Sequence, residues 1–115
     1  MQRRTFDSHG KIVNSHGLYP QAVRGVAREK NVTLIDLDVM SVQLYEALGV
    51  NTAPLAFNDN GKDATHHNSY GAYQLARCVT ESIRRSSLPL AAQLSAQPPY
   101  NPAHPDPVEH FVLAP

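Results

Sequence analysis

The residues best suited to chemistry are an aspartate and a histidine where a loop meets a helix. Asp63 and His66 lie three positions apart, within residues 63–72. A carboxylate placed three residues before an imidazole on such a turn can accept the Nδ1–H of that imidazole, which leaves Nε2 free to act as a base toward a hydroxyl held elsewhere. The spacing therefore indicates a pair in which Asp63 orients the ring and His66 accepts a proton.

Two other interpretations of this turn stay open. An Asp-x-x-His spacing also occurs as a helix-entry hydrogen bond without any catalytic role. Alternatively, Asp63, His66 and His67 could ligate a metal ion, because carboxylates and imidazoles are zinc ligands. Adjacent histidines usually point apart, however, and the sequence places no third ligand nearby. The metal interpretation is the weaker of the two, and we expect no metal and no cofactor.

A loop and a strongly periodic helix must position the turn. Residues 50–62 are rich in Asn, Asp and Gly, which predicts a loop. Asn68 has a side chain suited to capping the helix that follows. The apolar residues of that helix recur at helical spacing, at Ala72, Leu75, Ala76, Val79 and Ile83.

The first part of the chain is predicted to alternate between helix and strand. Residues 3–14 suit a short hairpin, and Pro20 suits the first turn of a helix over about 20–30. The apolar, β-branched run 32–37 is typical of a strand that is covered on both faces. Asp38 can cap a second helix.

The order of these elements favours an α/β layered fold. Only one interior strand is evident, and a lone buried strand would leave its backbone N–H and C=O groups unpaired. We therefore expect the rest of a sheet to lie upstream or in another molecule. Residues 1–95 are predicted to form part of one domain, and residues 96–115 a proline-rich extended tail, because proline excludes helix there.

Composition narrows the class of protein. Ten basic side chains balance ten acidic ones, so the chain lacks the excess of basic residues that is typical of proteins binding nucleic acids or membrane surfaces. No apolar run approaches the roughly 18 residues of a membrane span. The single cysteine, Cys78, excludes an internal disulfide and a cysteine-built zinc site. The first seven residues lack the apolar region of a signal peptide.

The turn and its surroundings resemble the final conserved block of the SGNH (GDSL-type) hydrolases, and most closely the rhamnogalacturonan acetylesterase-like branch. The pattern is Asp63-x-Thr65-His66 followed by Asn68-x-Tyr70-Gly71-Ala72. Further stretches are similar to the C-terminal half of that branch, at residues 2–7, 10–13, 16–17, 19–24, 34–37, 44–49 and 102–107. The resemblance thus extends along nearly the whole chain.

This resemblance implies the C-terminal part of a three-layer α/β/α fold of flavodoxin-like type, with the N-terminal strands missing. It also implies a serine esterase that removes acetyl groups from an acetylated carbohydrate, with His66 as general base and Asp63 as its orienting partner. Complete members of such a family are expected to be secreted or periplasmic.

The chain departs from the family where the nucleophile should be. In that family the serine lies in a Gly-Asp-Ser block, and a glycine and an asparagine from two further blocks complete the oxyanion hole. None of these blocks occurs here, and no serine lies in a Gly-x-Ser-x-Gly context. We therefore expect this chain alone to be inactive on esters. The alternative is a non-enzymatic module that self-associates through an open sheet edge.

Overall fold

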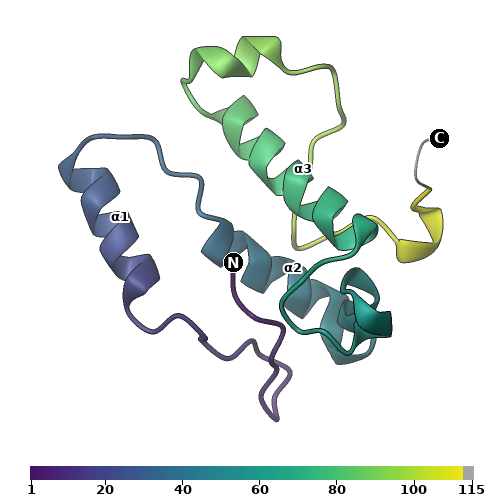
Figure 1. Cartoon of the computed structure of the whole chain (residues 1–115). Coiled ribbons are helices and arrows are strands. Elements are labelled where there is room, and N and C mark those ends of the chain that lie inside the picture. The colour runs from purple at the N-terminus through teal and green to yellow at the C-terminus, as the bar shows by residue number, and fades with distance from the viewer. Residues whose placement is uncertain (113–115) are drawn as a thin grey trace.

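The computed structural model describes residues 1–112, which form a helical structure (Figure 1). The three α-helices are α1 (Tyr19–Glu29), α2 (Leu37–Thr52) and α3 (Ser69–Arg85). Four short 3-10 helices connect or follow them, namely η1 (Ala53–Ala56), η2 (Asp59–Gly61), η3 (Pro89–Gln93) and η4 (Val108–His110). None of the helices among these residues is both long and apolar enough to cross a membrane.

The expected α/β/α fold is wrong for this chain. Between residues 1 and 112 no strand or sheet forms, and β pairing is confined to two isolated bridges, Phe6 with Ile12 and Phe57 with His67. The predicted strand at 32–37 has no regular secondary structure over 32–36 and pairs with no other strand among the described residues. High β propensity favours an extended backbone, but a strand is defined by a partner that pairs with its N–H and C=O groups. The described chain supplies no such partner.

The start of α2 also corrects a prediction. Asp36, not Asp38, caps the helix, because its carboxylate accepts a hydrogen bond from the backbone N–H of Val39. Leu37 therefore belongs to the first turn of α2 and not to a strand. Gly49 interrupts the helix near its end with a φ of 73°, a left-handed conformation that glycine adopts without strain.

Other local predictions are confirmed. The helix expected at 20–30 is α1, and Asn68 caps α3 by accepting a hydrogen bond from the N–H of Gly71. The hairpin expected at 3–14 is present only as a tight turn closed by the Phe6–Ile12 bridge, with Gly10 at a φ of 74°.

The core lies between α2, η1 and the first half of α3. Its buried side chains are Leu44, Tyr45, Ala56, Phe57, Tyr70 and Leu75. Side chains from the N-terminal turn and from the C-terminal tail pack against this cluster, among them Phe6, Ile12 and Phe111. Segments from both ends of the chain thus meet over the α2–α3 pair, close to the loop that carries Asp63 and His66.

The proline-rich tail crosses α3 as an extended segment (Figure 1). Tyr100 is buried at 5% exposure and donates a hydrogen bond to Gln74. Asp106 pairs with Arg77 and accepts a hydrogen bond from Gln74. The proposed division between residues 1–95 and 96–115 stays a prediction, and residues 113–115 of that tail lie outside the described part of the chain.

Candidate active-site turn

Asp63 organises the turn before α3 by accepting three hydrogen bonds. Its Oδ1 accepts from the backbone N–H of Thr65 at 2.6 Å and from that of His66 at 2.9 Å. Its Oδ2 lies 2.7 Å from Nδ1 of His66. One carboxylate thus fixes both the backbone of the turn and the imidazole of His66.

The hydrogen bonds also set the ionisation of Asp63. Because the N–H groups of His66 and Thr65 stabilise the charged form, the pKa of Asp63 falls from 3.8 to about 2. The side chain of His66 is 75% exposed and that of Asp63 is 27% exposed. An imidazole that donates Nδ1–H to a carboxylate carries its lone pair on Nε2. His66 therefore presents a proton acceptor toward solvent.

His67 has the opposite environment. Its Nε2 lies 2.7 Å from the hydroxyl of Tyr45, and its ring lies against Phe57 with ring centroids 4.3 Å apart. Burial lowers the pKa of His67, because desolvation disfavours the charged imidazole. The two adjacent histidines point apart, and no group of three metal-ligating side chains occurs among residues 1–112.

The N-terminal segment supports the turn from outside. The backbone N–H of Arg4 donates to the carbonyl of Ala64 at 2.9 Å, and its guanidinium donates to the carbonyls of Gly61 and Asp63. The same guanidinium lies 4.9 Å from the centre of the Phe57 ring. Sequence reasoning missed this role of Arg4. Residues 2–7 are part of the family resemblance, but nothing in the sequence predicts that this segment contacts residues about sixty positions later in the chain.

The beginning of α3 is fixed by a close backbone approach. Asn68 donates its side-chain amide to the carbonyls of Leu55 and Phe57, which ties the helix start to η1. Gly71 lies against Ala56 so closely that a Cβ on Gly71 would be 2.1 Å from the Ala56 carbonyl oxygen. A glycine at this position allows α3 to touch the end of η1.

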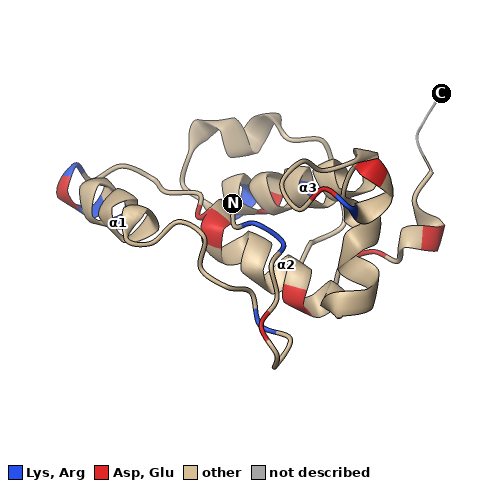
Figure 2. Ribbon diagram, turned by 60° about the horizontal axis from the view of Figure 1, so that its bottom comes forward, with Lys and Arg blue, Asp and Glu red and all other residues tan. Residues whose placement is uncertain are grey.

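Asp63 and His66 form a carboxylate–imidazole pair. Within residues 1–112 no serine hydroxyl is hydrogen-bonded to His66. Basic and acidic residues are interspersed along the chain (Figure 2). The geometry suits proton transfer at Nε2 of His66, while the catalytic roles of Asp63 and His66 stay predictions.

The comparisons with known proteins give one significant relative. The rhamnogalacturonan acetylesterase RhgT of Bacillus subtilis (strain 168) is 35% identical over 105 residues, covering 82% of this chain. The chain spans only 45% of the length of that protein. No family model matches the chain, and no solved structure matches it. The extent of the similarity supports the expected relationship: the chain is similar to a C-terminal part of the rhamnogalacturonan acetylesterase family.

Proposed function

We propose that Asp63 and His66 are the aspartate and histidine of a Ser-His-Asp triad in a carbohydrate esterase that deacetylates a polysaccharide. The observation that carries the proposal is the 2.7 Å contact between Asp63 Oδ2 and His66 Nδ1, with the imidazole 75% exposed. The family relationship supports the esterase class. The serine and the oxyanion donors belong to the part of the enzyme that this chain does not span.

The residues present account for the proton transfers of such a reaction. Nε2 of His66 takes the proton of the attacking serine hydroxyl and then gives it to the departing sugar hydroxyl. A water molecule repeats the cycle on the acetylated serine. Asp63 keeps the hydrogen on Nδ1 and stabilises the imidazolium that forms in both steps. Its low pKa keeps the carboxylate charged across the neutral range.

The residues absent account for the expected inactivity of the isolated chain. Removing one oxyanion donor from a serine hydrolase costs roughly 3–4 kcal/mol of transition-state stabilisation, and removing the nucleophile ends the acyl-transfer route. We therefore expect no serine-dependent turnover of p-nitrophenyl acetate by the 115-residue chain. Turnover that a serine-directed inhibitor abolishes in this chain would contradict that statement.

The catalytic assignment is tested by restoring the missing part. We call the portion of the Bacillus subtilis acetylesterase that the alignment leaves uncovered the complementary segment. Joined to this chain, it should give an active esterase, and His66→Ala should lower kcat by at least about 10³-fold. His104→Ala, which removes another exposed histidine, is the matched control and should leave kcat unchanged. Equal activity of the two variants would refute the role of His66.

A second candidate is a non-enzymatic module that associates with another chain. The observation that favours it is a set of large apolar side chains on α1 that stay exposed, with Tyr19 at 81% and Val23 at 55%. A monomer at high micromolar concentration in sedimentation experiments would argue against self-association. Retained binding by a variant lacking His66 would separate this function from catalysis.

A further inference from the structure

A surface pocket lies next to the turn that carries His66. It is lined by η1, by residues 57–61 and by Asn68, and we call it the loop pocket. Its volume is about 380 Å³, and small-molecule sites in proteins have volumes of about 300–1,000 Å³. The loop pocket is therefore large enough for a small ligand.

The bridge between Phe57 and His67 places part of the loop pocket on the same side of the chain as the imidazole of His66. Phe57 and His67 pair in an antiparallel bridge, and their rings pack together with centroids 4.3 Å apart. The neighbouring pair is joined by a backbone hydrogen bond of 2.9 Å, from the N–H of Asn58 to the carbonyl of His66. Side chains alternate between the two sides of a paired segment, and opposed residues share a side with Cβ atoms about 5 Å apart. Asn58 and His66 therefore project together on the exposed side.

Three successive side chains of the loop pocket have hydrogen-bonding groups that the described chain does not use. Within residues 1–112 the side chains of Asn58, Asp59 and Asn60 form no hydrogen bond and no ion pair, and all three are exposed. An amide offers N–H donors and a carbonyl acceptor, and a carboxylate offers acceptors. The hydroxyl groups of a sugar both donate and accept hydrogen bonds, whereas the charge of Asp59 disfavours an anionic group. This set of side chains therefore favours sugar hydroxyls as ligands.

The backbone of the loop has a conformation that few residues adopt. Asp59 and Asn60 have φ values of 53° and 52°, in the left-handed region. Residues other than glycine are uncommon there, although Asn and Asp occur more often than the others. Such conformations cluster at ligand-binding and active sites. Hydrogen bonds of 3.0 Å from Gly61 N–H to the carbonyl of Asn58 and from Lys62 N–H to that of Asp59 close the loop.

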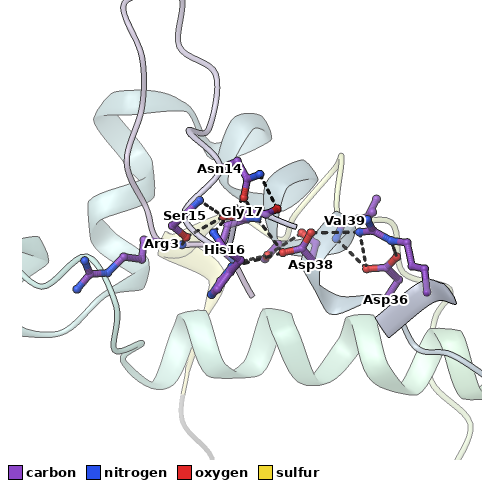
Figure 3. Close-up of polar contacts among 11 residues, drawn as sticks. Arg3, Asn14, Ser15, His16, Gly17, Asp36, Asp38 and Val39 are labelled. Atoms are coloured by element: carbon purple, nitrogen blue, oxygen red, sulfur yellow. Dashed lines mark hydrogen bonds and ion pairs between the residues drawn. The ribbon is translucent and has the colours of Figure 1, made fainter. Parts of the chain in front are cut away.

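The N-terminal segment joins the loop to the turn. The guanidinium of Arg4 donates to one carbonyl of the loop and to one of the turn. The N–H of Arg3 donates to the hydroxyl of Ser15 at 3.0 Å. Figure 3 shows Arg3 and Ser15 in a polar network that extends to Asp38 near the start of α2. Because these bonds order the loop pocket before a ligand arrives, less ordering entropy is lost on binding.

We propose that the loop pocket binds the sugar whose acetyl ester reaches His66, and that the side-chain amide of Asn58 holds the sugar by hydrogen bonds to its hydroxyl groups. The proposal rests on the proposed function and deepens it, because it assigns the residues that bind the carbohydrate. Asn58 has an amide that does not ionise, so its role is to bind the substrate and not to transfer a proton.

Binding is tested on the 115-residue chain itself. Because this chain alone should not hydrolyse esters, an acetylated oligosaccharide stays intact during a titration. The probe is a set of acetylated oligosaccharides from rhamnogalacturonan, the polysaccharide for which the Bacillus subtilis relative is named. At millimolar concentration it should shift the side-chain amide NMR signals of Asn58 and leave those of Asn51 in place. Asn51 is an exposed asparagine at the end of α2 that does not line the loop pocket. Unchanged signals of Asn58 would overturn the proposal.

Two asparagine substitutions give a kinetic test in the chain joined to the complementary segment. The quantity measured is the ratio of kcat/KM for the acetylated oligosaccharides to kcat/KM for p-nitrophenyl acetate, which carries no sugar. Asn58→Ala should lower this ratio by about 10-fold, because hydrogen bonds to the sugar are lost. Asn51→Ala is the matched control and should leave the ratio unchanged.

The substitution at Asn58 separates binding from structure. Alanine is compatible with the φ of −69° and ψ of 174° at this position, and the backbone hydrogen bonds of Asn58 do not involve its side chain. Asn58→Ala should therefore fold normally. An equal fall of kcat/KM for both esters would leave the ratio unchanged, which would indicate a structural role for Asn58 and overturn the proposal.

The loop pocket and the catalytic assignment fail separately. If the oligosaccharides shift the signals of Asn58 but the joined protein hydrolyses neither ester, the loop pocket is retained and the proposed catalytic function is rejected. If turnover depends on His66 but the ratio is the same with and without Asn58→Ala, the catalytic function is retained and the loop pocket is rejected.

Discussion

At the scale of single residues, two neighbouring histidines differ in environment: one is packed against the core and the other is exposed to solvent. His67 points inward to Tyr45 and Phe57, and this anchorage fixes the backbone from which His66 projects outward. The sequence predicted the Asp63–His66 contact, because three residues separate a carboxylate from an imidazole at a helix entry. It could not predict the partner of His67, since Tyr45 lies 22 positions earlier in another helix.

The titration of Asp63 gives the first prediction. Because its folded pKa of about 2 lies below its ordinary value of 3.8, the carboxylate stabilises the turn fully above about pH 4, and this contribution is lost as the pH falls through 2. In NMR titrations the amide signals of Thr65 and His66 should shift with a midpoint near pH 2. A midpoint near 4 would show that the three hydrogen bonds are not maintained in solution.

The Tyr45 hydroxyl gives the second prediction. Tyr45→Phe removes the partner of His67 Nε2 in a half-buried site, which should lower the free energy of unfolding by about 1–3 kcal/mol. Urea denaturation measures the change. Tyr73→Phe is the control, because Tyr73 is 41% exposed and substitutions at such positions usually change stability by less than about 0.5 kcal/mol. A similar loss in both variants would argue against a specific Tyr45–His67 bond.

At the scale of elements, the helices could be predicted from the sequence, whereas the presence or absence of a strand that pairs with residues 32–37 could not. The 3.6-residue periodicity and the capping side chain of Asn68 predicted α3, because both signals are local. The run 32–37 carries strand propensity, yet strand formation depends on a neighbour that propensity does not report. Asp36 begins α2 because its carboxylate accepts the backbone N–H of Val39, so that Leu37 lies in the first turn of the helix.

Two glycines in helices give the third prediction. Gly71→Ala would place a methyl group 2.1 Å from the Ala56 carbonyl oxygen and should cost about 1–3 kcal/mol or more, because α3 must move from η1. Gly25→Ala, in α1, meets no atom within 4 Å and should stabilise the chain by roughly 0.5–1 kcal/mol. Thermal unfolding of both variants distinguishes them. The two substitutions should change the free energy of unfolding in opposite directions. Stabilisation by Gly71→Ala would show that Gly71 and the carbonyl of Ala56 do not lie close together.

At the scale of the whole molecule, the C-terminal tail completes the packing of α3. The side chain of Gln74 is fully buried, and the tail supplies its hydrogen-bond partners. The hydroxyl of Tyr100 donates to its carbonyl oxygen, and its amide donates to the carboxylate of Asp106. The sequence predicted an extended tail from its prolines, but not that it would supply the hydrogen-bond partners of a buried glutamine. That knowledge requires the path of the chain, which composition alone does not define.

The tail gives the fourth prediction. Tyr100→Ala removes a large buried ring and the donor to Gln74, so the free energy of unfolding should fall by about 3–5 kcal/mol. Tyr19→Ala is the control in the 115-residue chain, because Tyr19 is 81% exposed; its effect should stay within about 0.5 kcal/mol. Differential scanning calorimetry compares the two. A small effect of Tyr100→Ala would show that the tail is detached from α3 in solution.

The dependence of α3 on Tyr100 and Asp106 has a consequence for the order in which the protein matures. A ribosome makes α3 before it makes either of these residues, so Gln74 has no internal partner during that interval. Burying an unpaired amide costs free energy, and the nascent helix is therefore favoured to keep that face in water until the tail arrives. Native closure around Gln74 is an event that follows synthesis of residue 106, and a translational pause before that residue would prolong the open, chaperone-accessible form.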